Sequence, residues 1–532
     1  MGAQQVKTRS ARSAFAGRAA WSFGDQALSS LTNAALSIFI ARVTSAEGYG
    51  YFAVAFTVYT FLLGTCRALV NQPFAMRWPG AEEDDARWAA AAGTGLALVF
   101  GLLCAAVVVP VALLFAAGAG PTVATMCVLL PLLLVQDVWR AVFIARQRPR
   151  SAAANDALWT VLQFAGLSVA VAIGVRDPVP LVMVWAVAGW VAAVVAVAQG
   201  RTRPAVRSAT RFARKTVDLS RYLVAEWVTV LGAAQIALLL VATIGSAVDV
   251  GSLRGAQTLL GPLNILGIGA FGFLVPELAR RPWLTARQLR MAALATSAGL
   301  GLINLAWGAV LLLLPENAGR AVLGSTWTGA RETILAMTLW ATGIAVATGP
   351  IVVIRSRGRP RDSFIVNVLL GFLLLAGAPI GLVLGGAEGA AWGFALATLS
   401  TAPLFGIRME RILGSMPSGG GHGGDDAGGH PGGDGAVVAD PHRPEHARSG
   451  ADVHAVADPH RPEHARSGAD VHAVADDGLP AAGRPVAEGH TLVEGEVAAR
   501  HDVTPDDEAG GVAQAQPGAD PGRGGQLGPA AP

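Results

Sequence analysis

The chain has 532 residues, of which 52% are hydrophobic and only 14% are charged, and its formal net charge is +3. A soluble protein of this length needs more charge than this to cover its surface, so the composition favours a protein embedded in lipid. The small net charge gives no support to nucleic acid as a partner.

A basic segment, residues 1–20, precedes a series of long apolar runs. About 20 apolar residues span roughly 30 Å of hydrocarbon as a helix. The runs lack the alternation of barrel strands, so the sequence predicts an all-α integral membrane protein. We count twelve transmembrane helices, at residues 21–43, 50–72, 88–116, 121–145, 155–175, 179–199, 220–244, 252–276, 288–314, 330–354, 363–384 and 388–407.

Arginines are concentrated in alternate connections between these runs, which predicts that both termini are cytoplasmic in a multi-pass protein of the cell membrane. The predicted domains are an N-lobe at 21–200, a basic linker at 201–218, a C-lobe at 219–413 and a tail at 414–532. The opposite connections are short, which argues against a membrane glycan ligase or polymerase with an external catalytic platform.

Four motifs recur about two hundred positions apart, which indicates that the membrane body is duplicated. Each half holds six predicted helices, an even number, so the two lobes are expected to be parallel repeats around a central cavity, an architecture common in secondary transporters. The pairs are Ser45 to Gly50 with Ser246 to Gly251, Pro73 and Arg77 with Pro276 and Arg280, Asp25 with Glu226, and Arg148-Pro149-Arg150 with Arg359-Pro360-Arg361.

The tail is rich in Gly, Pro, Ala, Asp and His, and it contains an 18-residue tandem repeat. Such a composition cannot build a core, so we expect the tail to be disordered. All ten histidines lie there; metal binding is one interpretation, and a low-complexity extension without fixed structure is the one we favour. The membrane body has no histidine, so a proton relay there must use carboxylates.

The first predicted helix carries a polar stripe that includes Gln26, Ser30 and Asn33. Such a stripe indicates a face on a water-filled cavity, and the alternative is hydrogen bonding between helices. Three carboxylates within predicted helices, Asp25, Asp137 and Glu226, are candidates for coupling to an ion gradient. Asp25 and Glu226 are equally compatible with acidic residues favoured near a helix N-terminus.

Arginines within the spans suggest selection for an anion. Arg67, Arg140 and Arg254 are candidates for a cationic cavity lining, since guanidinium groups bind phosphate in a bidentate manner. The alternatives are anchoring at the interface and a structural pair of Asp137 with Arg140, which lie three residues apart on one helix face. No nucleotide-binding loop, metal-ligand motif or dinucleotide fingerprint is present, so we expect no enzyme activity, no cofactor and no metal site in the membrane body.

The order and spacing of several loose motifs resemble a bacterial polysaccharide transporter of the multidrug/oligosaccharidyl-lipid/polysaccharide exporter superfamily. The resemblance spans residues 14 to about 410. The residues that carry it are Trp21-Ser22, Asp25-Gln26, Ser29-Ser30, Asn33, Ala41-Arg42, Glu47, Gly50, Phe52-Ala53, Arg67 to Val70, Gln136-Asp137, Arg140, Arg146, Arg148-Pro149 and Ala256 to Asn264.

This resemblance implies two six-helix lobes around a V-shaped cavity that opens alternately to each side. It implies flipping of an undecaprenyl-pyrophosphate-linked oligosaccharide, with membrane lipid and polysaccharide-assembly proteins as further partners. Its nearest candidates for pyrophosphate binding are Arg67, Arg140 and Arg254. Two alternatives stay open, a cation-coupled drug or metabolite exporter of the same superfamily and a membrane scaffold whose tail recruits glycan-synthesis enzymes.

Overall fold

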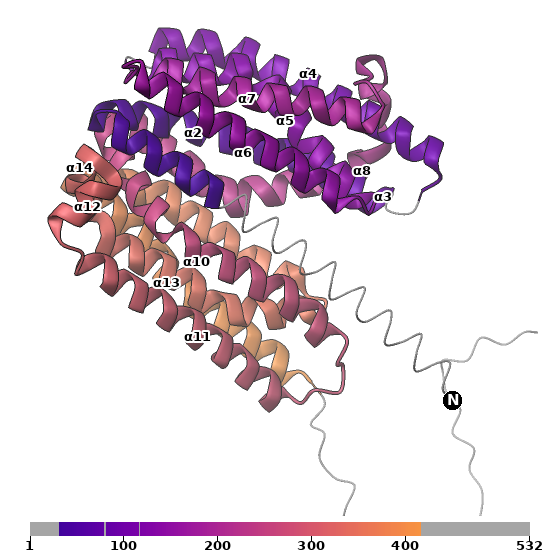
Figure 1. The fold of residues 1–532 in the computed structure, drawn as a ribbon. Coiled ribbons are helices and arrows are strands. Elements are labelled where there is room, and N and C mark those ends of the chain that lie inside the picture. The colour runs from indigo at the N-terminus through magenta and orange to yellow at the C-terminus, as the bar shows by residue number, and fades with distance from the viewer. Residues whose placement is uncertain (1–30, 79–80, 116–117, 417–532) are drawn as a thin grey trace, which may run out of the picture. The chain divides into compact units, whose positions relative to one another are not determined.

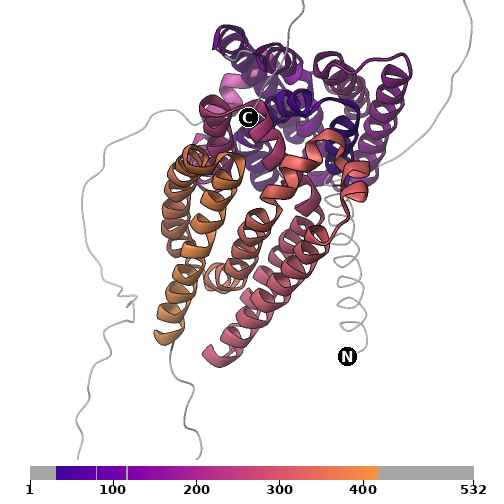
Figure 2. The same cartoon turned by 90° about the vertical axis from the view of Figure 1, so that its left-hand side faces the viewer.

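A computed structural model describes residues 31–78, 81–115 and 118–416, which all belong to one compact unit. Every regular element within these residues is a helix (Figure 1). Both views show two groups of helices (Figure 2). We call the group that runs from helix Leu31–Val43 to α7 the N-lobe and the group from η3 to α14 the C-lobe, with α8 as the linker helix.

The helices have the following bounds. The N-lobe holds Leu31–Val43, α2 (Ala46–Cys66), η1 (Arg67–Asn71), α3 (Gln72–Arg77), α4 (Glu83–Phe115), α5 (Gly120–Ala145), α6 (Pro149–Ala172) and α7 (Pro178–Gly200). Then come η2 (Val206–Ser208), α8 (Ala209–Trp227), η3 (Val228–Gly232), α9 (Ala233–Ile244), α10 (Ala247–Ala279), α11 (Ala286–Leu312), α12 (Glu316–Leu323), η4 (Gly324–Thr326), α13 (Trp327–Ser356) and α14 (Pro360–Gly414).

Among the described residues, nine helices are long and apolar enough to cross a membrane. The predicted helices 363–384 and 388–407 form the two halves of α14, which is broken by non-helical backbone at Gly385 and Gly386. Only the last part of predicted helix 21–43 is described, and α6 is not among the nine. Several helices begin earlier than predicted, because capping residues such as Ser45 and Ser246 precede the apolar runs.

The recurring motifs have equivalent local structures. Ser45 and Ser246 cap α2 and α10, and the glycines five residues later, Gly50 and Gly251, pack against each other where the two helices meet. Arg148 and Arg359 precede α6 and α14 with nearly the same backbone angles, φ −113° and ψ 54° against φ −111° and ψ 56°. A residue with left-handed φ precedes each arginine, Gln147 in the N-lobe and Gly358 in the C-lobe.

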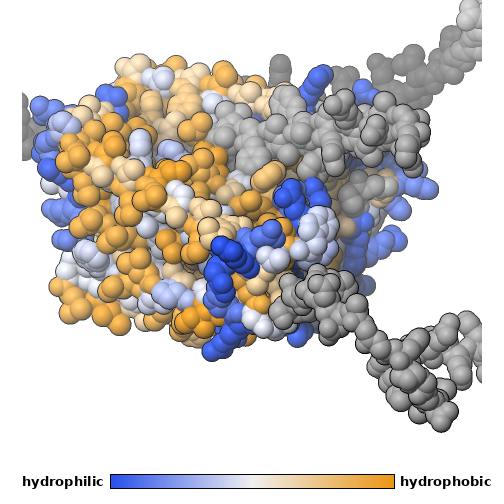
Figure 3. All heavy atoms as spheres, turned by 90° about the horizontal axis from the view of Figure 1, so that it is seen from below, coloured by the Kyte–Doolittle hydropathy of each residue, from blue (hydrophilic) through white to orange (hydrophobic). Residues whose placement is uncertain are grey.

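One helix lies at the centre of each lobe. In the N-lobe α5 contacts α2, α4, α6 and α7, and in the C-lobe α13 contacts α10, α11 and α14. The lobes meet where α2 contacts α9 and α10. Apolar side chains cover much of the left and central part of the face shown in Figure 3, and hydrophilic residues lie at its left edge and from its lower middle toward the right. This distribution fits a surface that faces lipid.

Candidate functional site

The charged centre of the N-lobe is an ion pair between η1 and α5. Arg67 donates from Nε to Oδ2 of Asp137 at 2.9 Å and from Nη2 to Oδ1 at 2.6 Å. The side chain of Asp137 is 9% exposed, whereas that of Arg67 is 41% exposed. This side-on geometry satisfies both carboxylate oxygens. It leaves Nη1 of Arg67 without an acceptor among the described residues.

The backbone that carries Arg67 is a π-helix rather than an α-helix, and the N–H of Gln72 bonds to the carbonyl of Arg67. Pro73 follows at the start of α3 and has no N–H to continue the ordinary ladder, so the α-helical pattern is already interrupted beside this segment. The same segment supplies Asn71, whose Nδ2 donates to Oδ2 of Asp137 at 2.8 Å. Insertions of this kind are frequent at functional sites.

A second ion pair lies between α5 and α6. Nε of Arg140 is 2.8 Å from Oδ2 of Asp156, and each side chain is 14% exposed. Gln136 donates from Nε2 to Asp156 at 3.0 Å and to Asn155 at 3.1 Å, and Asn155 donates to the carbonyl of Ala192 on α7 at 2.8 Å. Polar contacts therefore connect α5, α6 and α7 in the interior of the lobe.

A structural pair of Asp137 with Arg140, one of the interpretations that the sequence leaves open, does not form. A separation of three residues puts both side chains on one face of α5, but Asp137 pairs with Arg67 and Arg140 pairs with Asp156. Both residues instead form ion pairs with residues of neighbouring helices, and the position of a residue on its own helix face does not predict such partners. The sequence interpretation missed Asn71, Asn155 and Asp156. Asn155 and Asp156 stand next to each other at the start of a predicted apolar helix, and this pair of polar residues was the signal that could have found them.

Arg254 lies where the two lobes meet. Its guanidinium is 5.0 Å from the ring centre of Phe56 on α2, and it donates to Gln257 at 3.4 Å. No carboxylate of the described residues forms an ion pair with it. Phe56 and Arg67 are eleven residues apart on α2 and η1, close to three helical turns, so both arginines lie along one side of this helix.

The remaining candidates lie apart from this cluster or outside the described residues. Glu226, at the end of α8, pairs with Arg355 on α13 at 2.9 Å, and the two side chains are 43% and 29% exposed. Asn33 is exposed, on helix Leu31–Val43. Asp25, Gln26 and Ser30 lie outside the described residues.

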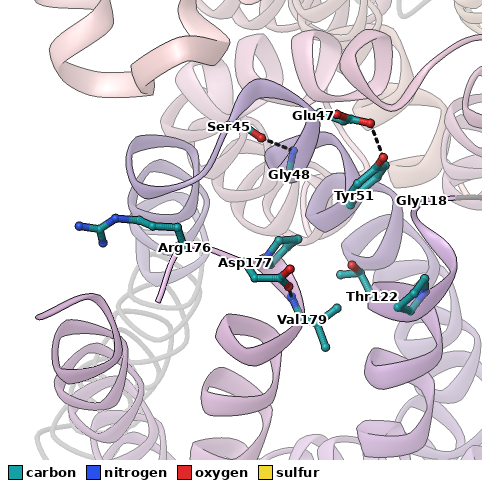
Figure 4. Close-up of a pocket in the computed structure, with 11 residues that line it drawn as sticks. Ser45, Glu47, Gly48, Tyr51, Gly118, Thr122, Arg176, Asp177 and Val179 are labelled. Carbon is teal, nitrogen blue, oxygen red and sulfur yellow. Dashed lines mark hydrogen bonds between the residues drawn. The ribbon is translucent and has the colours of Figure 1, made fainter. Parts of the chain in front are cut away.

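A separate shallow pocket lies at the ends of α2, α5 and α7, with a volume of about 470 Å³. Tyr51 donates to Glu47 beside it, and Asp177 caps α7 by accepting from the N–H of Val179 at 2.8 Å (Figure 4). The side chain of Arg176 points away from these groups. The polar groups of this pocket serve mainly as helix caps, so we place the candidate site in the N-lobe cluster instead.

Comparison with solved structures identifies the fold. A multidrug resistance MATE family transporter of the MOP superfamily, in an inward-facing conformation, matches with a TM-score of 0.60 and 13% identity over 72% of this chain and 94% of that chain. A MOP superfamily transporter from Pyrococcus furiosus matches with a TM-score of 0.53 and 12% identity, over 75% and 94%. The lipid II flippase MurJ matches with a TM-score of 0.54 and 11% identity, over 73% and 87%.

No protein-family model and no curated protein matches this chain. The structural matches show that the chain has the fold of MOP superfamily transporters, a multi-pass helical membrane fold. At these identities the likeness concerns the fold alone, so the chemistry of the site has to be argued from the residues of this chain.

Proposed function

We propose that this chain is a membrane transporter that flips an anionic lipid-linked oligosaccharide, carried on undecaprenyl pyrophosphate, from the cytoplasmic to the outer leaflet. We propose twelve spans in two parallel six-helix repeats around a central cavity, with a basic linker, both termini in the cytoplasm and a disordered tail. The observation that carries the proposal is that Arg67, at the end of α2, and Arg254, which packs on Phe56 of α2, lie along the same side of that helix. Arg67 is partly exposed with Nη1 free of acceptors in the described residues, and Arg254 forms no ion pair there.

The geometry of Arg67 suits an anion that must be bound and then released. Asp137, whose carboxylate also accepts from Asn71, holds the guanidinium from its buried side, so its orientation is fixed before a substrate arrives. The free Nη1 and the guanidinium of Arg254 then offer charge-assisted hydrogen bonds to phosphate oxygens. Because Asp137 already neutralises part of the charge of Arg67, Arg67 binds a phosphate more weakly than an unpaired arginine would. The transported lipid is therefore released more easily.

Coupling to an ion gradient is part of the proposal, with Asp25, Asp137 and Glu226 as the candidate carriers. In the described structure Asp137 accepts hydrogen bonds from Arg67 and Asn71 at both oxygens. It can therefore exchange a proton only after Arg67 moves away. Substrate phosphate that draws Arg67 off Asp137 would link substrate binding to protonation.

Reconstitution tests this function. We expect the full chain in liposomes to make an undecaprenyl-pyrophosphate-linked oligosaccharide accessible to a lectin on the opposite side. Arg67→Gln and Arg254→Gln should each slow the exchange about tenfold or more, because each loses charge-assisted hydrogen bonds to phosphate. Arg331→Gln is the matched control, since Arg331, near the start of α13, is half exposed and pairs with Glu316 of α12. Normal flipping by both cavity variants would contradict the proposal.

Export of an organic cation is a second candidate function, and the balance of charge in the N-lobe favours it. Asp137 and Asp156 match Arg67 and Arg140 in number, so the cluster is not strongly cationic. Under this alternative Asp137→Asn should abolish resistance to cationic compounds, whereas Arg254→Gln should leave it unchanged. The opposite pattern, with oligosaccharide transport lost in Arg254→Gln, supports the flippase.

A scaffold that recruits polysaccharide-assembly proteins through its tail is the third alternative. A chain truncated after Gly414 distinguishes it, because a transporter should keep most of its flipping activity. In a strain without a paralogue, loss of the whole chain should leave the lipid-linked oligosaccharide on the cytoplasmic leaflet. If the truncated chain restores surface glycan, the scaffold is excluded.

A further inference from the structure

The linker helix α8 has one face that is buried against the N-lobe and one whose side chains are exposed. Its buried residues recur at three- and four-residue steps, and they are Ala209, Phe212, Thr216 and Ser220. Phe212 stacks on Trp78 with 5.4 Å between the ring centres. Arg77 binds the helix at the carbonyl of Lys215 and at Asp218. α8 is thus fixed to the N-lobe although it continues into the C-lobe.

The outer face of α8 is strongly basic. Arg207 in η2 and Arg211, Arg214 and Lys215 on α8 are all exposed. The first three follow one another at four- and three-residue spacings and form one stripe, and Lys215 lies beside it. We call these four residues the linker basic face. Asp218 is the one acid between residues 201 and 225, and its ion pair with Arg77, at 2.6 Å, neutralises it. The positive charge of the face is therefore not balanced within the linker.

The length of the helix places this face beside the lipid headgroups. Helix runs from residue 206 to residue 244 as one candidate span of 39 residues. At about 1.5 Å per residue this is roughly 58 Å, nearly twice the hydrocarbon core of about 30 Å. Residues near the start of α8 must therefore lie beyond the hydrocarbon.

Trp88 supports the same position. The charged groups of Lys215 and Arg211 lie over its ring, at 4.5 Å and 5.2 Å from the ring centre. Tryptophan is enriched at the level where hydrocarbon meets headgroups. Arginine and lysine at that level attract anionic lipids, and clusters of four or more form recognisable binding surfaces.

We infer that the linker basic face binds the phosphate headgroups of anionic phospholipids in the adjoining leaflet, and so fixes the linker helix at the membrane surface. This interaction is separate from the proposed transport, because it uses the outer face of α8 and none of the residues of the N-lobe cluster. Its measurement does not depend on any transported substrate.

The test is lipid binding by the detergent-solubilised full chain, followed by native mass spectrometry. Phosphatidylglycerol and phosphatidylcholine with the same acyl chains are the probes. We expect a clear preference for phosphatidylglycerol that falls about tenfold in the double variant Arg207→Gln with Arg214→Gln, because each cation near the surface contributes several-fold. These two arginines leave the contacts of Trp88 in place, and an unchanged thermal midpoint verifies folding.

Arg148→Gln with Arg361→Gln is the matched control, since it removes the same charge from two exposed arginines outside the linker. We expect it to change the preference less than twofold. An equal loss in both double variants would show general attraction to a basic surface and would overturn the proposal. Equal binding of the two lipids by the unmodified chain, or displacement of phosphatidylglycerol by excess glycerol 3-phosphate, would overturn it too.

Discussion

The N-lobe and the C-lobe join equivalent helices by different means. In the N-lobe, α6 and α7 are connected by side-chain hydrogen bonds, from Asn155 to the carbonyl of Ala192 at 2.8 Å and from Trp159 to that of Trp185 at 3.3 Å. In the C-lobe, the two halves of α14 approach closely through glycines, and Arg408 pairs with Asp362 near the ends of the helix at 3.5 Å. A Cβ atom on Gly381 or Gly389 would fall on the carbonyl oxygen of the other.

The same difference extends to the central helices. Asp137 and Arg140 make α5 a charged helix within its lobe. The offset between Arg148 and Arg359 places Thr348 and Ile351 of α13 at the corresponding positions. The ion pairs of α5 are groups that a charged substrate can rearrange, whereas the ion pair between the halves of α14, Arg408 with Asp362 at 3.5 Å, lies near the two ends of that helix. This comparison assigns substrate response to the N-lobe and a rigid supporting role to the C-lobe.

The largest expected effect comes from removing the buried carboxylate of the N-lobe. Asp137→Ala leaves Arg67 and Asn71 without their partner, and breaking a buried pair costs about 3–5 kcal/mol. Because Arg67 is 41% exposed, water compensates in part, and we expect a loss of about 2–3 kcal/mol in unfolding free energy. Denaturation of the detergent-solubilised chain, followed by tryptophan fluorescence, measures it.

The ion pair between the linker helix and the C-lobe provides the matched comparison. Glu226→Ala breaks a pair whose side chains are 43% and 29% exposed, so we expect a loss of about 0–1 kcal/mol. The double variant Arg67→Leu with Asp137→Leu should recover part of the loss, because it removes both buried charges together. Equal losses in Asp137→Ala and Glu226→Ala would remove the distinction between the lobes.

The sequence alone predicts much of this fold, but it predicts few of the side-chain partners in the candidate site. The length of the apolar runs predicts most of the long helices among the described residues, and the recurring Ser45 and Ser246 motifs mark equivalent helix starts, because capping is a local effect. The partners of Asp137 and Arg140 are not local. They depend on how α5 packs against η1 and α6, which one helix face does not specify.

The π-helix at Arg67 is an intermediate case. Pro73 is visible in the sequence, and it interrupts the hydrogen-bond ladder just where the extra residue is inserted. However, Pro276 occupies the related place in the C-lobe within an α-helix. η3 is a π-helix with no proline after it, so proline is neither required nor sufficient for the insertion.

An intermediate effect is expected at the glycine contact of the C-lobe. Gly381→Ala puts a methyl group against the backbone of Gly389, which no rotamer change can relieve, so we expect a loss of about 1–3 kcal/mol. Gly166→Ala is the counterpart in α6, where the added methyl meets only a methyl of Val184 at 2.8 Å, and we expect less than about 1 kcal/mol. Thermal unfolding of both variants in one detergent compares them. A larger loss in Gly166→Ala would contradict the view that the two halves of α14 form the more tightly packed contact.

The smallest expected loss of stability comes from removing a buried asparagine amide. It compares an amide that bonds to a neighbouring helix with one that bonds within its own helix. Asn155 and Asn304 are both buried, but Nδ2 of Asn155 donates across to α7, whereas Nδ2 of Asn304 donates to Leu300 on its own helix, each at 2.8 Å. Asn155→Ala should cost about 1–2 kcal/mol, because it also leaves Nε2 of Gln136 with one acceptor fewer. Asn304→Ala should change stability by less than about 0.5 kcal/mol, since the carbonyl of Leu300 keeps its bond within the helix and alanine favours helix. If the two losses were equal, burial of the amide rather than its position between helices would stabilise the N-lobe, and its polar network would have no special role in holding α5, α6 and α7 together.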